Sequence, residues 1–171
     1  RDNAIDLGSS SARYKDIYLS GGAFLGGTGT ANELSDYEEG TWSPAFTGDG
    51  GSASGVSFND RVGTYVKIGE SVTVHIFIGL ASWSSGPSGN IKIGTLPFAA
   101  NSLSSYRAAG SIGYANNWGQ APGGCIISAG SNLISLRKRN GTSAMDNLSN
   151  NVTAGDMSGD EQIIISMTYQ V

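Results

Sequence analysis

The side chains that most often catalyse reactions or bind metals are scarce in this chain. It has one histidine, His75, and one cysteine, Cys125, and neither Gly-x-Ser-x-Gly nor His-Glu-x-x-His occurs. A serine triad and a zinc site within one chain both need more partners than these. We interpret His75 as a hydrogen-bonded strand or interface residue, and Cys125, in GGCIISAG, as a small buried hydrophobe. The sequence therefore predicts no catalytic residue and no metal ligand, although a three-fold oligomer could gather three copies of His75 or of an aspartate around one ion.

Glycoside hydrolysis needs only two carboxylates at a set separation, so the acidic residues are considered separately. Six of the 14 stand next to glycine or serine, as Asp49 and Asp156 do, and carboxylates in such positions commonly shape turns. We expect no enzymatic activity and no cofactor. A small polysaccharide-degrading domain is the less favoured alternative.

Tryptophans beside amide side chains offer a different chemistry, the binding of sugars. A flat indole can cover the apolar face of a pyranose ring while neighbouring amides bond to its hydroxyl groups. Two tryptophans stand in YANNWGQAPGG and ASWSSGPSGN, which we expect to be loops. The candidate glycan-binding residues are Trp83, Tyr114, Asn116, Asn117, Trp118 and Gln120. A tryptophan folded back over its own loop, or packed between subunits, is the alternative that these residues leave open.

Charge and hydropathy exclude several kinds of partner. The net charge is -4 and the pI is about 4.8, so the chain lacks the basic footprint of a nucleic-acid-binding domain. We interpret the run Arg137-Lys138-Arg139 as a solvated turn between strands. No run of about 18 apolar residues is present to span a membrane. We therefore expect no nucleic-acid partner and no membrane insertion.

Short β-strands are the elements that would position these side chains. The 26 glycines, with many serines, threonines and asparagines, divide the chain into apolar runs of strand length. In the run 71–80, Val72, Val74, Ile76 and Ile78 alternate with a mixed set that includes Phe77. The alternation predicts one core face and one face that leans on a neighbouring subunit. The expected strands cover residues 41–46, 55–58, 62–68, 71–80, 90–95, 107–114, 124–128, 133–137 and 162–169.

The two ends of the chain differ in their supply of apolar residues. Ile163, Ile164 and Ile165 are consecutive, which predicts a central strand covered on both faces. Residues 1–40 have too few apolar residues for a core of their own. A thin stalk followed by a knob is the arrangement that this contrast favours.

Four further segments form a recognisable set: LGSSSARYKDIYLSGG at residues 7–22, DYEEGTWSPAF at 36–46, GTYVKIGESVTVHIFI at 63–78 and IKIGTLPF at 91–98. Together they bear a resemblance to the C-terminal receptor-binding region of bacteriophage tail fibres and tailspikes. It implies an all-β homotrimer with a short intertwined stalk, residues 1–40, followed by an antiparallel β-sandwich or jelly-roll knob, residues 41–171.

The resemblance also implies a place and a set of partners. The protein would sit on the phage tail in the virion and act at the host cell surface. Its partners would be two further copies of itself, upstream fibre or virion proteins, and a host cell-surface polysaccharide or lipopolysaccharide. The structural alternative is a clamp that only trimerises the chains and guides their folding.

Overall fold

The computed structural model describes residues 5–138 and 150–171, which fall into two compact units, residues 1–36 and 37–171. In the first unit, β1 (Ala23–Phe24) pairs with β2 (Glu33–Leu34) around a single 3-10 turn, Thr30–Asn32. No described residue of this unit is buried, and apolar side chains such as Ile5 and Tyr18 are exposed. This unit has no core of its own, as its composition predicts.

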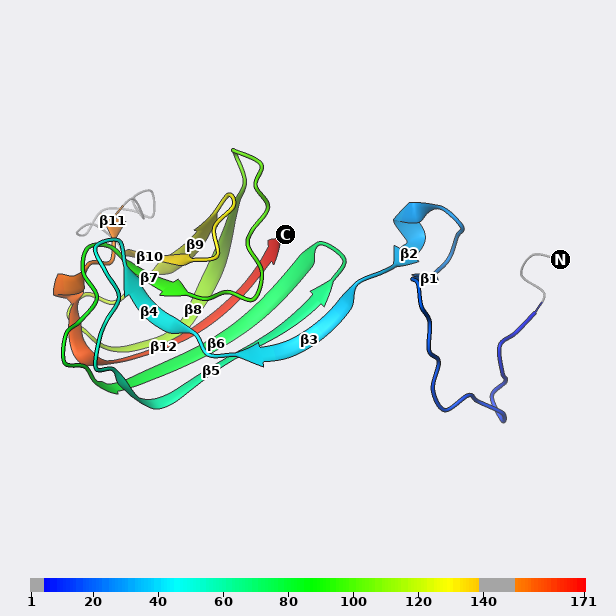
Figure 1. Cartoon of the computed structure of the whole chain (residues 1–171), viewed down its shortest axis with the longest axis horizontal. Coiled ribbons are helices and arrows are strands. Elements are labelled where there is room, and N and C mark those ends of the chain that lie inside the picture. Colours follow the sequence, from blue (N-terminus) through cyan, green and yellow to red (C-terminus); the bar gives the residue numbers. More distant parts are fainter. Residues whose placement is uncertain (1–4, 139–149) are drawn as a thin grey trace. The chain divides into compact units, whose positions relative to one another are not determined.

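The second unit is an antiparallel β-structure, so the predicted all-β class is confirmed. Its sheet follows the order β3-β5-β6-β12-β8-β9-β10-β7-β4, and β11 pairs with β10. Figure 1 shows how these strands curl into one sheet. The strands are β3 (Tyr37–Trp42), β4 (Ala45–Gly48), β5 (Ser57–Ile68), β6 (Ser71–Ser82), β7 (Ile91–Gly94), β8 (Arg107–Trp118), β9 (Gly124–Ser128), β10 (Ile134–Lys138), β11 (Asn150–Asn151) and β12 (Met157–Gln170).

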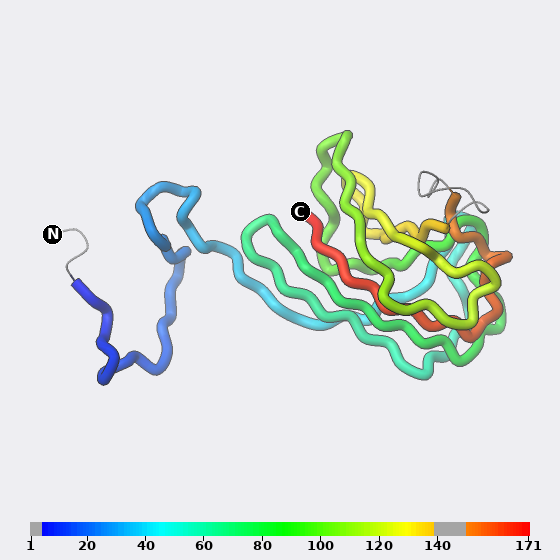
Figure 2. Tube along the Cα trace, turned by 180° about the vertical axis from the view of Figure 1, so that it is seen from behind, coloured from blue at the N-terminus to red at the C-terminus, as the bar shows by residue number. Residues whose placement is uncertain are grey.

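The sheet folds over into two layers at β8. The first half of this strand pairs with β9 and the second half with β12, so β8 belongs to both layers (Figure 2). Gly110 stands where the two pairings meet, and a Cβ there would lie 2.8 Å from both Cys125 Sγ and Met167 Cε. A side chain at this position would push the layers apart, which explains the glycine.

The long strands β5, β6 and β12 bury one face and expose the other. Val72, Val74, Ile76 and Ile78 of β6 are buried, as the alternation predicts. On β12 the prediction of two covered faces is wrong for the single chain, because Ile164 is 44% exposed although its two neighbours are fully buried. The reason is that β12 alternates strictly within a sheet that has only one inner face.

Two strand boundaries also differ from the sequence expectation. The expected strand 41–46 is divided between β3 and β4, because the chain leaves the ladder around Pro44, which has no N–H to donate. The basic run is not a turn, since Arg137 and Lys138 are the last residues of β10. Its third member, Arg139, lies outside the described residues.

Candidate ligand-binding site

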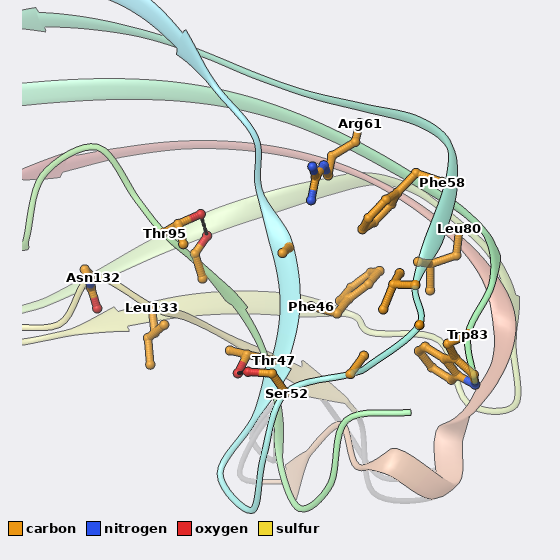
Figure 3. A pocket seen from close by; sticks show the side chains of 15 residues that line it. Phe46, Thr47, Ser52, Phe58, Arg61, Leu80, Trp83, Thr95, Asn132 and Leu133 are labelled. Carbon is orange, nitrogen blue, oxygen red and sulfur yellow. Dashed lines mark hydrogen bonds between the residues drawn. The ribbon is translucent and has the colours of Figure 1, made fainter. Parts of the chain in front are cut away.

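A cavity of about 610 Å³ lies beside β4, at one end of the two layers. No strand other than β7 pairs with β4 in the described part of the chain, so its second edge is open. Figure 3 shows Arg61, Phe58, Leu80 and Trp83 on one side of β4, and Thr95, Asn132 and Leu133 on the other. The cavity therefore lies along β4, with aromatic side chains and Arg61 on one side of this strand and Thr95, Asn132 and Leu133 on the other.

Aromatic side chains form one wall of this cavity. Phe46 projects from β4, Phe58 from β5, and Trp83 follows the end of β6. The indole of Trp83 lies against backbone, since a Cβ added at Gly159 would be 3.1 Å from its Nε1 and one at Gly86 would be 3.1 Å from its Cζ2. The two glycines let the ring pack closely, which fixes the plane that it presents.

Arg61 is the charged residue among those that line the cavity. In the register of β5 and β6 it stands opposite the buried Ile78, so its side chain starts from the inner face of the sheet. Its guanidinium carbon lies 4.2 Å from the centroid of the Phe58 ring. This cation–π contact leaves the edges of the guanidinium group available for hydrogen bonds.

Hydroxyl groups form the polar part of the lining. Thr47 Oγ1 and Ser52 Oγ are 2.9 Å apart. Thr95 has a φ of 62°, a conformation that is rare for a β-branched residue. Its hydroxyl donates to the Gly94 carbonyl oxygen at 2.7 Å and is 3.3 Å from that of Ser43, and these bonds hold Thr95 in place. Backbone strain of this kind concentrates at functional sites.

Of the two tryptophans in the predicted glycan site, Trp83 lines the cavity and Trp118 does not. Trp118 is the last residue of β8, so the segment predicted as a loop continues the strand. Its Nε1 donates to the Gln162 carbonyl oxygen at 3.1 Å, and its ring packs edge-on against Phe46 at 5.7 Å. Trp118 thus reaches the cavity only indirectly, by supporting the ring of Phe46.

The other predicted glycan residues lie near Trp118 on the exposed side of β8 and just after it. Tyr114 donates its hydroxyl hydrogen to Gln162 Oε1 at 3.1 Å. Asn117, with a φ of 63°, donates from Nδ2 to Asp160 Oδ2 at 3.1 Å. Asn116 and Gln120 are exposed. The structure therefore brings Tyr114, Asn116 and Asn117 together with β12 and places Trp83 with a different set of side chains.

Sequence reasoning missed Arg61, Phe58 and Thr95. Phe58 and Arg61 are three residues apart, and in a regular strand side chains at this spacing point to opposite faces, so the sequence does not predict their contact. They meet because β5 is irregular between Ser57 and Asp60. Thr95 lies one residue after β7 in a run that reads as ordinary strand. The Ser-Gly-rich surroundings of Trp83 were the one available signal for this region.

Perturbed titratable groups lie away from the cavity. Cys125 is buried, as predicted, and burial raises the pKa of its thiol to about 11, which disfavours the reactive thiolate form. Burial alone would raise the pKa of Asp156, but hydrogen bonds from Lys138 and Thr153 outweigh it and lower this pKa. His75 is exposed on the outer side of β6. Among the described residues, no three His, Cys, Asp or Glu side chains cluster as a metal site would require.

Comparison with known proteins identifies a relative in fold. No family model and no curated protein sequence matches the chain. Among solved structures, the crystal structure of the Dettilon tailspike protein is similar, with a TM-score of 0.60 and 19% sequence identity over 78% of this chain. The similar region makes up 24% of that protein's chain, so the present chain spans about a quarter of its length. The chain thus has an all-β fold that is also found in a tailspike protein.

Proposed function

We propose that this chain is the C-terminal receptor-binding region of a bacteriophage tail fibre or tailspike. It belongs to the virion, assembles as a homotrimer and binds a polysaccharide or lipopolysaccharide on the host cell, so that the phage adsorbs. The observation that carries the proposal is the fold shared with the Dettilon tailspike protein. The segments of residues 7–98 that resemble tail fibres support it independently of that fold.

The outer face of the long strands supports self-association. Between the row of Val62 and the row of Ile68, this face comprises Val62, Thr64, Val66 and Ile68 of β5, Ser71, Thr73, His75 and Phe77 of β6, and Ile164, Ser166, Thr168 and Gln170 of β12. None of these positions carries Lys, Arg, Asp or Glu. A sheet face in contact with water normally carries charged side chains, whereas the centre of a protein interface is depleted of them.

One row of this outer face is apolar across four neighbouring strands. Val62, Phe77, Ile164 and Tyr114 stand opposite one another in the register of β5, β6, β12 and β8. Three of the four, Val62, Ile164 and Tyr114, are between 41% and 44% exposed. We propose that this row packs against the other chains of the trimer. Residues 1–40 would form the intertwined stalk and residues 41–171 the knob.

Glycan binding is proposed for the end of the knob that holds the aromatic residues. The proposed contacts remain Trp83, Tyr114, Asn116, Asn117 and Gln120, and Trp118 takes part by supporting the ring of Phe46. Trp83 is the member whose ring borders a cavity of a size usual for small ligands. Tyr114 can serve the trimer contact or the glycan contact, because it lies at the end of the apolar row. We propose binding without hydrolysis.

A clamp that only holds the trimer together is the second candidate function. The observation that favours it is the packing of Trp118, whose indole N–H is already bonded within the chain. A polysaccharide-degrading domain is the third candidate, and no contact of the described residues specifically favours it.

Two measurements on the purified chain test these alternatives. Light scattering should give three times the chain mass of 17.6 kDa, and a monodisperse monomer at micromolar concentration contradicts the proposal. A bacterial glycan array should then show binding by the trimer. A trimer that binds no glycan and no host cell supports the clamp, and release of reducing ends supports the enzyme.

A further inference from the structure

The cavity beside β4 has a charge opposite to that of the whole chain. The chain is acidic, with a net charge of -4, yet the residues that line the cavity include Arg61 and no Asp or Glu. Arg61 is exposed to solvent, but it lines the cavity, so its positive charge attracts an anionic group of a ligand that binds there. The lining therefore favours an anionic ligand.

The contacts of Arg61 leave its guanidinium group able to bind such a ligand. Among the described residues its guanidinium group has a ring contact with Phe58, and no carboxylate oxygen lies within salt-bridge distance of it. Lys92 and Lys138, in contrast, each pair with an aspartate. A planar guanidinium presents paired N–H groups that match the two oxygens of a carboxylate. Stacking on Phe58 orients this plane and lowers the entropy lost on binding.

The rest of the lining suits a ring that bears hydroxyl groups. Trp83 offers a fixed indole face, and its N–H makes no hydrogen bond within the described residues. Across β4, the hydroxyls of Thr47 and Ser52 and the amide of Asn132 supply donors and acceptors (Figure 3). A volume of about 610 Å³ exceeds that of a single hexose unit and accommodates a short saccharide.

We propose that this cavity binds a saccharide unit that carries a carboxylate group, with Arg61 as the partner of the carboxylate and the Trp83 indole against the sugar ring. The inference deepens the proposed function, on which it rests for the class of ligand, by naming an acidic glycan and a site at the edge of β4. It assigns charge recognition to a residue outside the set proposed from the sequence.

The test is a titration of the assembled protein with acidic and neutral monosaccharides. The probes are the methyl glycosides of glucuronic acid, galacturonic acid and N-acetylneuraminic acid, each compared with a neutral glycoside, methyl glucoside or methyl galactoside. The readout is the NMR signal of the Trp83 indole N–H, assigned with Trp83→Phe. At least one acidic probe should shift this signal saturably, and the neutral probes should bind more weakly.

Three variants identify the group that recognises the charge. Arg61→Gln should weaken binding of the acidic probe roughly tenfold to a hundredfold, the range for losing a hydrogen bond to a charged group. Arg61→Lys should recover part of this loss, since the charge remains without the paired donors. Arg107→Gln removes an exposed arginine that is not part of the lining and should leave binding unchanged. Each variant should melt at the wild-type temperature.

Failure of this inference differs from failure of the proposed function. If no acidic probe binds, or if Arg61→Gln binds the acidic probe as tightly as wild type, the inference is wrong, even where the trimer still adsorbs to host cells. If an acidic probe binds through Arg61 but the protein binds no host cell and no glycan array, the proposed adsorption is wrong and the acidic-sugar site stands.

Discussion

Replacing Ile164 by aspartate tests whether the outer face of the long strands is an interface between chains. Ile164 is 44% exposed in the single chain, while Ile163 and Ile165 on either side are 0% exposed. The exposed part of the side chain amounts to about 80 Å², which would contribute about 2 kcal/mol per chain if a trimer buried it, at about 25 cal/mol per Å². Burial of the new carboxylate without a partner adds a further penalty of several kcal/mol.

The two possible states of the face give different results for Ile164→Asp. If the face is an interface, the variant should lose the trimer mass in light scattering, and its melting temperature should become independent of protein concentration. If the face is exposed to solvent, the change should cost no more than about 1 kcal/mol, as exposed strand substitutions do. Ile165→Asp is the control, because it places a charge in the core and should prevent folding in either case. An Ile164→Asp protein that remains trimeric with an unchanged melting temperature would refute the assignment of this face.

Further predictions concern single side chains. Lys138→Met should lower the stability at pH 7 by about 3 kcal/mol, because it leaves the largely buried Asp156 carboxylate without the cation that lowers its pKa. That difference should be full above the unfolded pKa of about 3.9 and should vanish as the pH falls through the lower folded pKa. A difference that does not decrease as the pH falls below about 3.9 would contradict it. Trp118→Ala should lower the melting temperature, since it removes the packing on Phe46. Trp83→Ala should weaken glycan binding by about 1–3 kcal/mol with little change in melting, and the reverse pattern would exchange the two roles. His75→Gln should leave adsorption and any trace hydrolysis unchanged in an assembled protein, and a lost hydrolytic rate would show that the chain is an enzyme.

The alternation of apolar residues was sufficient to predict the inner face of the sheet. In β6 every second residue from Val72 to Ile78 is buried. Successive side chains of a strand point to opposite faces, so only one register places all four of these apolar side chains on the inner face. Gly110 shows the limit of such reasoning. Its role depends on Cys125 and Met167, which come from two other strands, and nothing in the local sequence indicates that β8 passes between layers at this position.

The candidate site could be predicted only in part, for a related reason. The surroundings of Trp83 and Trp118 have similar compositions, so a sequence cannot separate the ring that borders a cavity from the ring that packs inward. The difference arises from Phe46 and Gln162, which contact Trp118 across 72 and 44 residues of chain. Arg61 carried no signal, because it is exposed like most arginines in strands, and only the structure shows that it lines a cavity.

The distribution of charge in the large layer is the reverse of the usual arrangement. Arg61, Lys67 and Glu161 belong to strands of this layer, and the last two are buried. The outer positions of Val62–Ile68 on β5, Ser71–Phe77 on β6 and Ile164–Gln170 on β12 carry no Lys, Arg, Asp or Glu. Glu161 is held by backbone N–H groups of Gly159 and Ser158. Since buried charges are costly, each needs a local partner or a ligand. Arg61 is exposed, and its described side-chain contact is with the Phe58 ring, so its guanidinium group can bind an anion at the cavity, whereas the uncharged rows of the opposite face suit an apolar partner. Ligand binding and assembly should therefore respond to different substitutions.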